Sequence, residues 1–209
     1  MDYAQFKQLE FRRKFWKVVG ADISVTDPQS GHEIGFIHMK AWKLREDIRL
    51  FTDRSRQQEI LQIHARTIID LGATYDVLAG NPPVPQFSLR RKGLKSMFVR
   101  DHWDLLDNNG NVFGELQETS STLALARRWI EVLPFGEIVG LAFAFVPQSY
   151  AIRTLLPDGG KALMATITHR KNPFIVKMLL DTTGAQVPVH PHVTMSAGAL
   201  LSVVDAAKN

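Results

Sequence analysis

Residues 193–207 read VTMSAGALLSVVDAA, a run in which small and apolar side chains surround the whole helical circumference. A helix that lies on a protein surface needs one polar stripe, and this run has none. At 1.5 Å per residue the segment is roughly 22 Å long, which is shorter than the ~30 Å hydrocarbon core of a bilayer. We therefore predict a helix that is buried on every side. Ala197, Gly198 and Ala199 are small enough for surrounding side chains to approach it closely.

The preceding part of the chain contains candidate strands that could surround such a helix. One sequence pattern occurs at 23–37 and again at 103–116. It consists of alternating apolar residues, a turn with Asp and Gly, and a second alternating run. A looser third copy spans 150–167. Alternation turns one row of side chains inward, and Asp and Gly suit a tight turn. The three copies therefore predict β-hairpins.

Other short segments also have the character of strands. They are 11–18, 47–53, 59–64, 74–79, 86–92 and 174–181. A series of about a dozen strands hides its edges by closing into a barrel or a sandwich. We expect a mostly β fold, in which a closed antiparallel barrel of about twelve strands surrounds the hydrophobic C-terminal helix. Residues 1–209 are predicted to form this single domain.

The region 120–149 departs from the strand pattern, and we interpret it as an apolar insertion. Apolar residues recur at three- and four-residue spacings over 121–133, which predicts one amphipathic helix. Residues 138–146, IVGLAFAFV, are apolar but too few to span a bilayer. The segment 135–146 either packs against the open end of the barrel or contacts a membrane or a protein partner.

The composition excludes several classes of function. The chain contains no Cys, which rules out disulfides, thiolate nucleophiles and Cys-based zinc sites. Its net charge of +4 is too small for the positive field of a dedicated nucleic-acid binder, so we predict no specific nucleic-acid partner. The first residues do not resemble a secretory signal. We expect a cytoplasmic protein, and a peripheral location at a membrane stays open.

Common catalytic motifs do not occur in the chain. G-x-S-x-G, H-E-x-x-H and G-x-G-x-x-G are all missing. Gly159-Gly160-Lys161 differs from a phosphate-binding loop, because Leu155 and Ala162 stand where Gly and Ser or Thr are required. We expect a protein that is not an enzyme and has no cofactor. An enzyme with an unrecognised site remains an alternative.

The turn in the second hairpin offers oxygen ligands that a calcium loop could use. They belong to Asp107, Asn109, Asn111 and Glu118. Val112, however, stands where a calcium loop needs Gly, and both flanks read as strands. A hairpin turn is therefore favoured over a calcium site.

His190 and His192 lie two residues apart, just before the predicted terminal helix. An extended segment puts both imidazoles on one side, a spacing that zinc or copper can use. The sequence suggests no third ligand nearby. The pair is either a weak metal site or part of a surface loop.

Two groups of basic residues predict a site for an anionic head group. The first choice is Arg90, Lys92 and Arg100, because alternation along two successive strands can project them to one side. The second choice is Arg12, Lys14 and Lys17. Neighbouring cations can hold phosphate through guanidinium and ammonium contacts. The alternative is a solvated strand face, since isolated surface charges contribute little.

The hairpin phrases at 23–37 and 103–116, and the terminal helix ending LLSVVD at 200–205, resemble the tubby C-terminal-like superfamily. Within it the chain resembles LURP-one-related proteins and phospholipid scramblases, and the resemblance covers about residues 10–207. It implies a closed barrel of twelve strands around a central hydrophobic helix. It also implies binding of anionic lipids, since tubby proteins bind phosphoinositides through basic residues of the barrel wall. The chain lacks the Cys-rich acylation site of scramblases, which argues against lipid scrambling.

The basic strands and the resemblance together favour a non-enzymatic binding module. Its expected ligand is an anionic phospholipid head group at a membrane surface. A structural or regulatory domain that binds a protein partner through 135–146 is the alternative.

Overall fold

The computed structural model describes residues 3–14, 21–39, 47–66, 72–92, 101–119, 148–170 and 175–206. In chain order the elements are η1 (Tyr3–Gln5), β1 (Gln8–Lys14), β2 (Ala21–Thr26), β3 (Glu33–Met39), β4 (Asp47–Phe51), β5 (Glu59–Ala65), β6 (Thr74–Ala79), β7 (Val84–Arg91), β8 (His102–Leu106), β9 (Val112–Glu118), β10 (Gln148–Leu155), β11 (Lys161–Arg170), β12 (Ile175–Asp181) and α3 (Pro191–Ala206). The predicted amphipathic helix over 121–133 and the apolar segment 135–146 lie outside the described residues.

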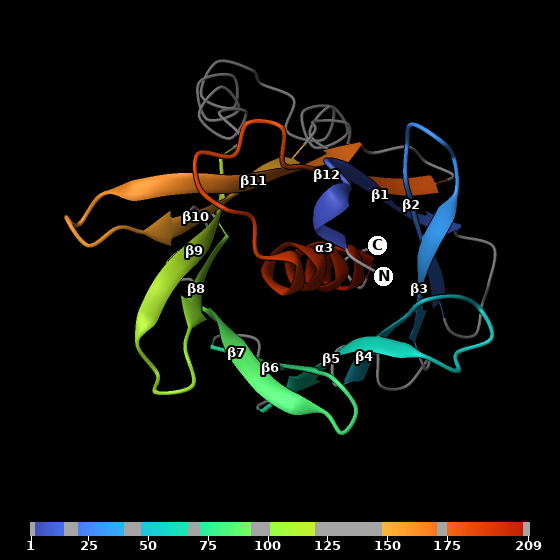
Figure 1. Ribbon diagram of the computed structural model, residues 1–209, viewed down its shortest axis with the longest axis horizontal. Coiled ribbons are helices and arrows are strands. Elements are labelled where there is room, and N and C mark those ends of the chain that lie inside the picture. The colour runs from blue at the N-terminus through green and yellow to red at the C-terminus, as the bar shows by residue number, and fades with distance from the viewer. Residues whose placement is uncertain are drawn as a thin grey trace, which may run out of the picture.

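The strands form one closed antiparallel barrel, seen as a ring in Figure 1. Each strand pairs with its neighbours in the sequence, and β1 closes the ring by pairing with β12. The closing register runs from Gln8 opposite Asp181 to Lys14 opposite Ile175. Closure gives every strand two neighbours and leaves no open sheet edge. The predicted fold class is confirmed.

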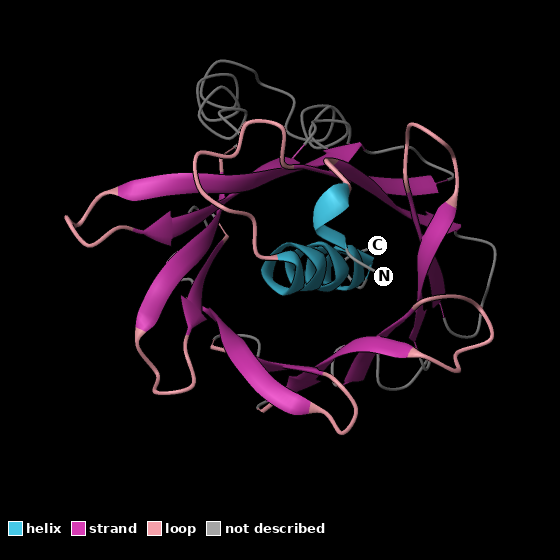
Figure 2. Cartoon of the chain, in the orientation of Figure 1, coloured by secondary structure: helices cyan, strands magenta, loops and turns pink. Residues whose placement is uncertain are grey.

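Helix α3 lies inside the ring of strands, as Figures 1 and 2 show. Every residue from 193 to 204 is buried. The prediction of a helix surrounded on all sides is therefore confirmed. The helix begins at Pro191, two residues before the predicted start. Proline suits the first helical turn because its φ is already helical and its missing N–H would have no partner there.

The predicted strands lie at the right places in the chain, but some of them begin at other residues in the structure. β1 begins at Gln8 rather than at residue 11, and β7 begins at Val84 rather than at residue 86. Pro85 therefore lies within a strand, next to a register shift between Val77 and Leu78 of β6. The start of a strand and a bulge are two of the places where a sheet accepts proline.

The turn between β8 and β9 is the hairpin turn that the sequence favours. Asp107 Oδ1 accepts hydrogen bonds from the backbone N–H groups of Asn109, at 2.9 Å, and Asn111, at 2.8 Å. Gly110 has a φ of 85°, which glycine adopts without steric cost. The side-chain amide of Asn111, which donates to Asp107 Oδ2 at 3.1 Å, is the main cause that lowers the pKa of Asp107, and the backbone hydrogen bonds lower it further.

Candidate functional site

A row of charged side chains crosses the outer wall of the barrel on β7, β8, β9 and β10. Arg90 lies opposite Asp104 in the sheet register, and Asp104 lies opposite Glu115. Glu115 in turn lies opposite Arg153. The strand residues next to them point into the core and are buried; they include Leu89, Leu105, Leu116 and Ile152. Strand alternation therefore places the charged row on the outside.

Arg90 and Lys92, both predicted from the sequence, converge on one carboxylate. Arg90 Nη2 lies 3.2 Å from Asp104 Oδ2, and Lys92 Nζ lies 2.9 Å from Asp104 Oδ1. The Asp104 side chain is only 5% exposed, whereas those of Arg90 and Lys92 are 48% and 53% exposed. The structure thus brings the two cations together over a buried acid.

Glu115 organises a second pair of cations. Lys161 Nζ lies 2.8 Å from Glu115 Oε2, and Arg153 Nη1 lies 3.6 Å from Glu115 Oε1. The Glu115 side chain is 7% exposed. A carboxylate this buried needs charged partners to offset its lost hydration.

We call Arg90, Lys92, Arg153 and Lys161 the basic strip. Its four cations surround two buried carboxylates, which leaves two positive charges in excess. Arg90, Arg153 and Lys161 lie on strands of the barrel, and Lys92 follows the end of β7, where its backbone N–H donates to the His102 carbonyl at 2.9 Å. The barrel wall therefore presents a fixed positive surface at this place.

His102 lies between the two carboxylates of the strip. Its Nε2 is 3.6 Å from Asp104 Oδ1 and 3.5 Å from Glu115 Oε2. Burial is the largest cause that lowers the pKa of His102, and the charge of Lys92 lowers it further. His102 is consequently neutral near pH 7, so the excess charge of the strip comes from lysine and arginine.

The other predicted cations do not join the strip. Arg100 and Lys17 lie outside the described residues, as does the side chain of Lys14. Arg12 lies on β1, separated from β11 by β12 in the strand order. Its register partner is Lys177, whose Nζ lies 3.3 Å from Glu10.

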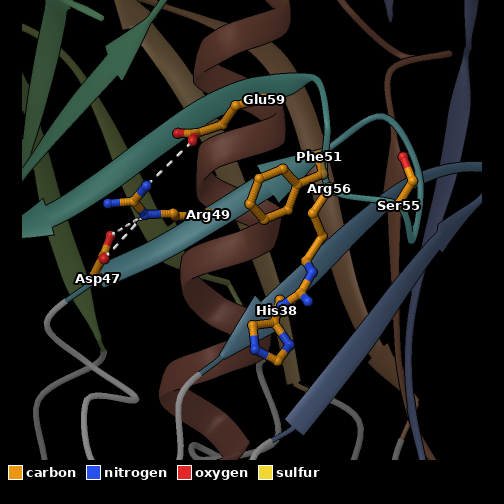
Figure 3. A pocket seen from close by; sticks show the side chains of 7 residues that line it. All are labelled: His38, Asp47, Arg49, Phe51, Ser55, Arg56 and Glu59. Carbon is orange, nitrogen blue, oxygen red and sulfur yellow. Dashed lines mark hydrogen bonds and ion pairs between the residues drawn. The ribbon is translucent and has the colours of Figure 1, made fainter.

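A pocket of about 540 Å³ opens on another part of the outer wall, over β3, β4, β5 and the β4–β5 turn. Figure 3 shows the side chains that line it. They are His38, Asp47, Arg49, Phe51, Ser55, Arg56 and Glu59. We call this site the outer pocket.

Most charged groups of the outer pocket are paired, and one is not. Arg49 Nε lies 3.1 Å from Asp47 Oδ2, and Arg49 Nη1 lies 3.5 Å from Glu59 Oε2. His38 Nδ1 lies 3.1 Å from Asp22 Oδ1, on the neighbouring strand β2. Within the described part of the chain, the Arg56 side chain makes no hydrogen bond or ion pair.

His190 and His192 flank the start of α3, with ring centroids 5.6 Å apart. Burial first, and then the charge of His190, lower the pKa of His192. Within the described ranges, no group of three or more His, Asp or Glu side chains gathers in a way that could hold a metal ion.

Sequence reasoning missed several residues that carry these two sites. Asp104 and Glu115 belong to the repeated hairpin. Each alternates along its strand with buried apolar residues, and this pattern could have indicated that both belong to the charged row. Lys161 was considered only as part of a phosphate loop, yet it pairs with Glu115 across 46 positions. No local pattern marks Arg49 or Arg56 as pocket residues.

The fold and these two sites define a closed antiparallel β-barrel with a buried central helix and a charged outer wall. No family model matches the chain, and neither the curated proteins nor the solved structures give a significant match. Of the helices in the described ranges, none has the length and apolar character needed to cross a bilayer.

Proposed function

We propose that the protein is a non-enzymatic binding module that recognises anionic phospholipid head groups at a membrane surface through the basic strip. The observation that carries this proposal is the excess of four partly exposed cations over two buried carboxylates. Lysine ammonium groups and arginine guanidinium groups have several N–H donors, and the carboxylates engage only some of them. The remaining donors are free to meet phosphate oxygens.

The size of the charge excess predicts weak and reversible binding. A cation near an anionic membrane surface contributes about 1 kcal/mol, so two excess charges contribute about 2 kcal/mol. The attraction is screened over about 10 Å at 0.1 M salt. Binding should therefore weaken as the salt concentration rises.

The proposal includes the resemblance to tubby-like proteins. A barrel of twelve strands with a buried C-terminal helix is the architecture which that resemblance implies, and this agreement supports it. The proposed ligand is the same in chemical class, an anionic lipid head group bound on the barrel wall.

Vesicle flotation tests the proposal at low salt, with phosphatidylserine-containing and pure phosphatidylcholine vesicles. The native chain should float only with the anionic vesicles. The double variant Lys92→Gln, Lys161→Gln should bind about 30-fold more weakly, which corresponds to about 1 kcal/mol for each lost cation. Arg90 and Arg153 still pair with Asp104 and Glu115 in this variant.

The matched control is Lys7→Gln, Lys177→Gln, which removes two lysine charges away from the strip. It should bind anionic vesicles much more tightly than the strip variant. Equal binding of the native chain to both kinds of vesicle would contradict lipid recognition. Equal losses in the two variants would show that net charge, and not the strip, is responsible.

A further inference from the structure

The outer pocket carries opposite net charges on its two sides. On one side Asp47 and Glu59 share the single guanidinium of Arg49, which leaves one negative charge in excess. On the other side stands Arg56, and Figure 3 shows its side chain reaching toward His38. The ring of Phe51 lies between the acidic side and Arg56. The pocket is therefore dipolar.

The β4–β5 turn holds Arg56 over the pocket. Asp53 Oδ1 accepts a hydrogen bond from the backbone N–H of Ser55 at 2.7 Å, and the Asp53 carbonyl accepts one from Arg56 at 3.2 Å. Arg56 has a φ of 58°, a conformation that few residues other than glycine adopt. The turn thus imposes this backbone, and the guanidinium folds back toward the barrel wall. A guanidinium with no carboxylate partner among the described residues is suited to bind an acidic group by two parallel hydrogen bonds.

The acidic side of the pocket retains capacity to accept hydrogen bonds. The side chains of Asp47 and Glu59 are 26% and 24% exposed, so a ligand can reach their carboxylates beside Arg49. An ammonium group supplies three N–H donors and a positive charge, and so matches this side.

We infer that the outer pocket binds a small zwitterion, a molecule in which a short carbon chain joins an ammonium group to a phosphate or carboxylate group. The acidic group would pair with Arg56, and the ammonium group with Glu59 and Asp47. The carbon chain would cross Phe51. A simple anion would bring no positive group to pair with Asp47 and Glu59. A simple cation would bring no negative group to pair with Arg56. The volume of about 540 Å³ is within the range of small-molecule pockets.

This inference goes beyond the proposed function, because it concerns a different ligand and a different part of the wall. Isothermal titration calorimetry of the full chain tests it with four probes. Phosphoethanolamine and β-alanine are zwitterions with a phosphate and a carboxylate, whereas inorganic phosphate and ethanolamine are the separate halves of phosphoethanolamine. At least one zwitterion should bind more than 10-fold tighter than either half. The preferred zwitterion identifies the acidic group.

Three single variants locate the binding. Arg56→Gln and Glu59→Gln should each weaken zwitterion binding at least 10-fold, because each removes one of the two charges that the ligand spans. Arg54→Gln is the matched control in the same turn, since Arg54 is occupied by Glu33 at 2.8 Å and by the Phe36 ring at 4.9 Å. It should bind like the native chain.

The inference is overturned if neither zwitterion binds, or if the separate halves bind as tightly. It is also overturned if Arg54→Gln weakens binding as much as Arg56→Gln does. The strip variant Lys92→Gln, Lys161→Gln should bind zwitterions normally. Its behaviour separates failure of this inference from failure of lipid recognition.

Discussion

Individual side chains on the outer wall are organised around buried acids. Asp104 and Glu115 are nearly inaccessible, and lysine and arginine side chains close over each of them. Removing a carboxylate would leave its cations without a partner, whereas removing one cation leaves another in place. The lysines are therefore the residues whose substitution tests binding with least damage to the fold.

The charge of Lys92 should be measurable at His102. The Lys92→Gln variant is expected to raise the pKa of His102, because the ammonium charge disfavours protonation of the ring. Burial, the larger cause, still lowers the pKa in this variant. An NMR titration of the His102 ring measures the change. Lys177→Gln is the control, and an unchanged pKa in Lys92→Gln would contradict the ion-pair geometry.

At the scale of elements, α3 packs closely against the barrel wall at Gly198, which has no side chain. A Cβ atom on Gly198 would lie 2.5 Å from two ring atoms of Phe11, which is itself buried on β1. The sequence indicates a stripe of small residues, but it does not show which of them bears the closest contact. That contact ties α3 to β1, one of the two strands that close the barrel.

Gly198→Ala should destabilise the protein by about 1–3 kcal/mol, the usual cost of overfilling a packed core. Denaturant unfolding of the two chains measures the difference. Gly184→Ala is the control, because its added Cβ would have its nearest neighbour at 3.8 Å. If Gly198→Ala unfolded at the same denaturant concentration as the native chain, the close contact between Gly198 and Phe11 would be contradicted.

The repeated hairpin provides a second comparison between equivalent positions. A Cβ on Gly114 would lie 2.6 Å from the carbonyl oxygen of Arg153, whereas a Cβ on Gly35 would meet nothing closer than 3.4 Å. Gly114→Ala should therefore destabilise by at least 1 kcal/mol more than Gly35→Ala, because backbone must shift. Thermal unfolding of both variants checks the order, and the reverse order would contradict the β9–β10 packing.

For the whole molecule, the strands and the helix inside them share one hydrophobic core. Partly buried histidines should make unfolding of this core sensitive to acid. The pKa values of His192 and His102 are lowered, so the unfolded chain binds protons more readily than the folded one. Stability should fall as pH drops through about 6.5, the ordinary value in the unfolded chain. The turn carboxylates with lowered pKa, such as Asp107, lose their contribution only at lower pH, below about 4.

Melting temperatures at pH 7.5 and 5.5 test this dependence. The native chain should melt lower at pH 5.5, and His192→Gln should reduce the difference, because glutamine takes up no proton. His32→Gln, on the exposed β2–β3 turn, is the control and should keep the native difference. If His192→Gln and the native chain showed the same difference in melting temperature between the two pH values, His192 would be excluded as a cause of the pH dependence.

Local patterns in the sequence contained much of the fold but little of the sites. Alternation predicted the hairpins and most strands, and the uniformly apolar run at 193–207 predicted the central helix. The pairing of Arg90 and Lys92 on one side was also predicted, although their shared partner Asp104 was not. Arg49, Arg56 and Glu59 had no local signal, because a pocket is formed by the relative position of strands and a turn.

The sequence by itself determined which side of each strand faces the core, because apolar residues at every second position must be buried together. Only the tertiary structure decided which charges meet. Lys161 reaches Glu115, and Asp47 and Glu59 share Arg49, because barrel closure and sheet register bring those strands side by side. A charge is available to a ligand according to the partners it already has, and those partners are chosen by register rather than by neighbouring residues.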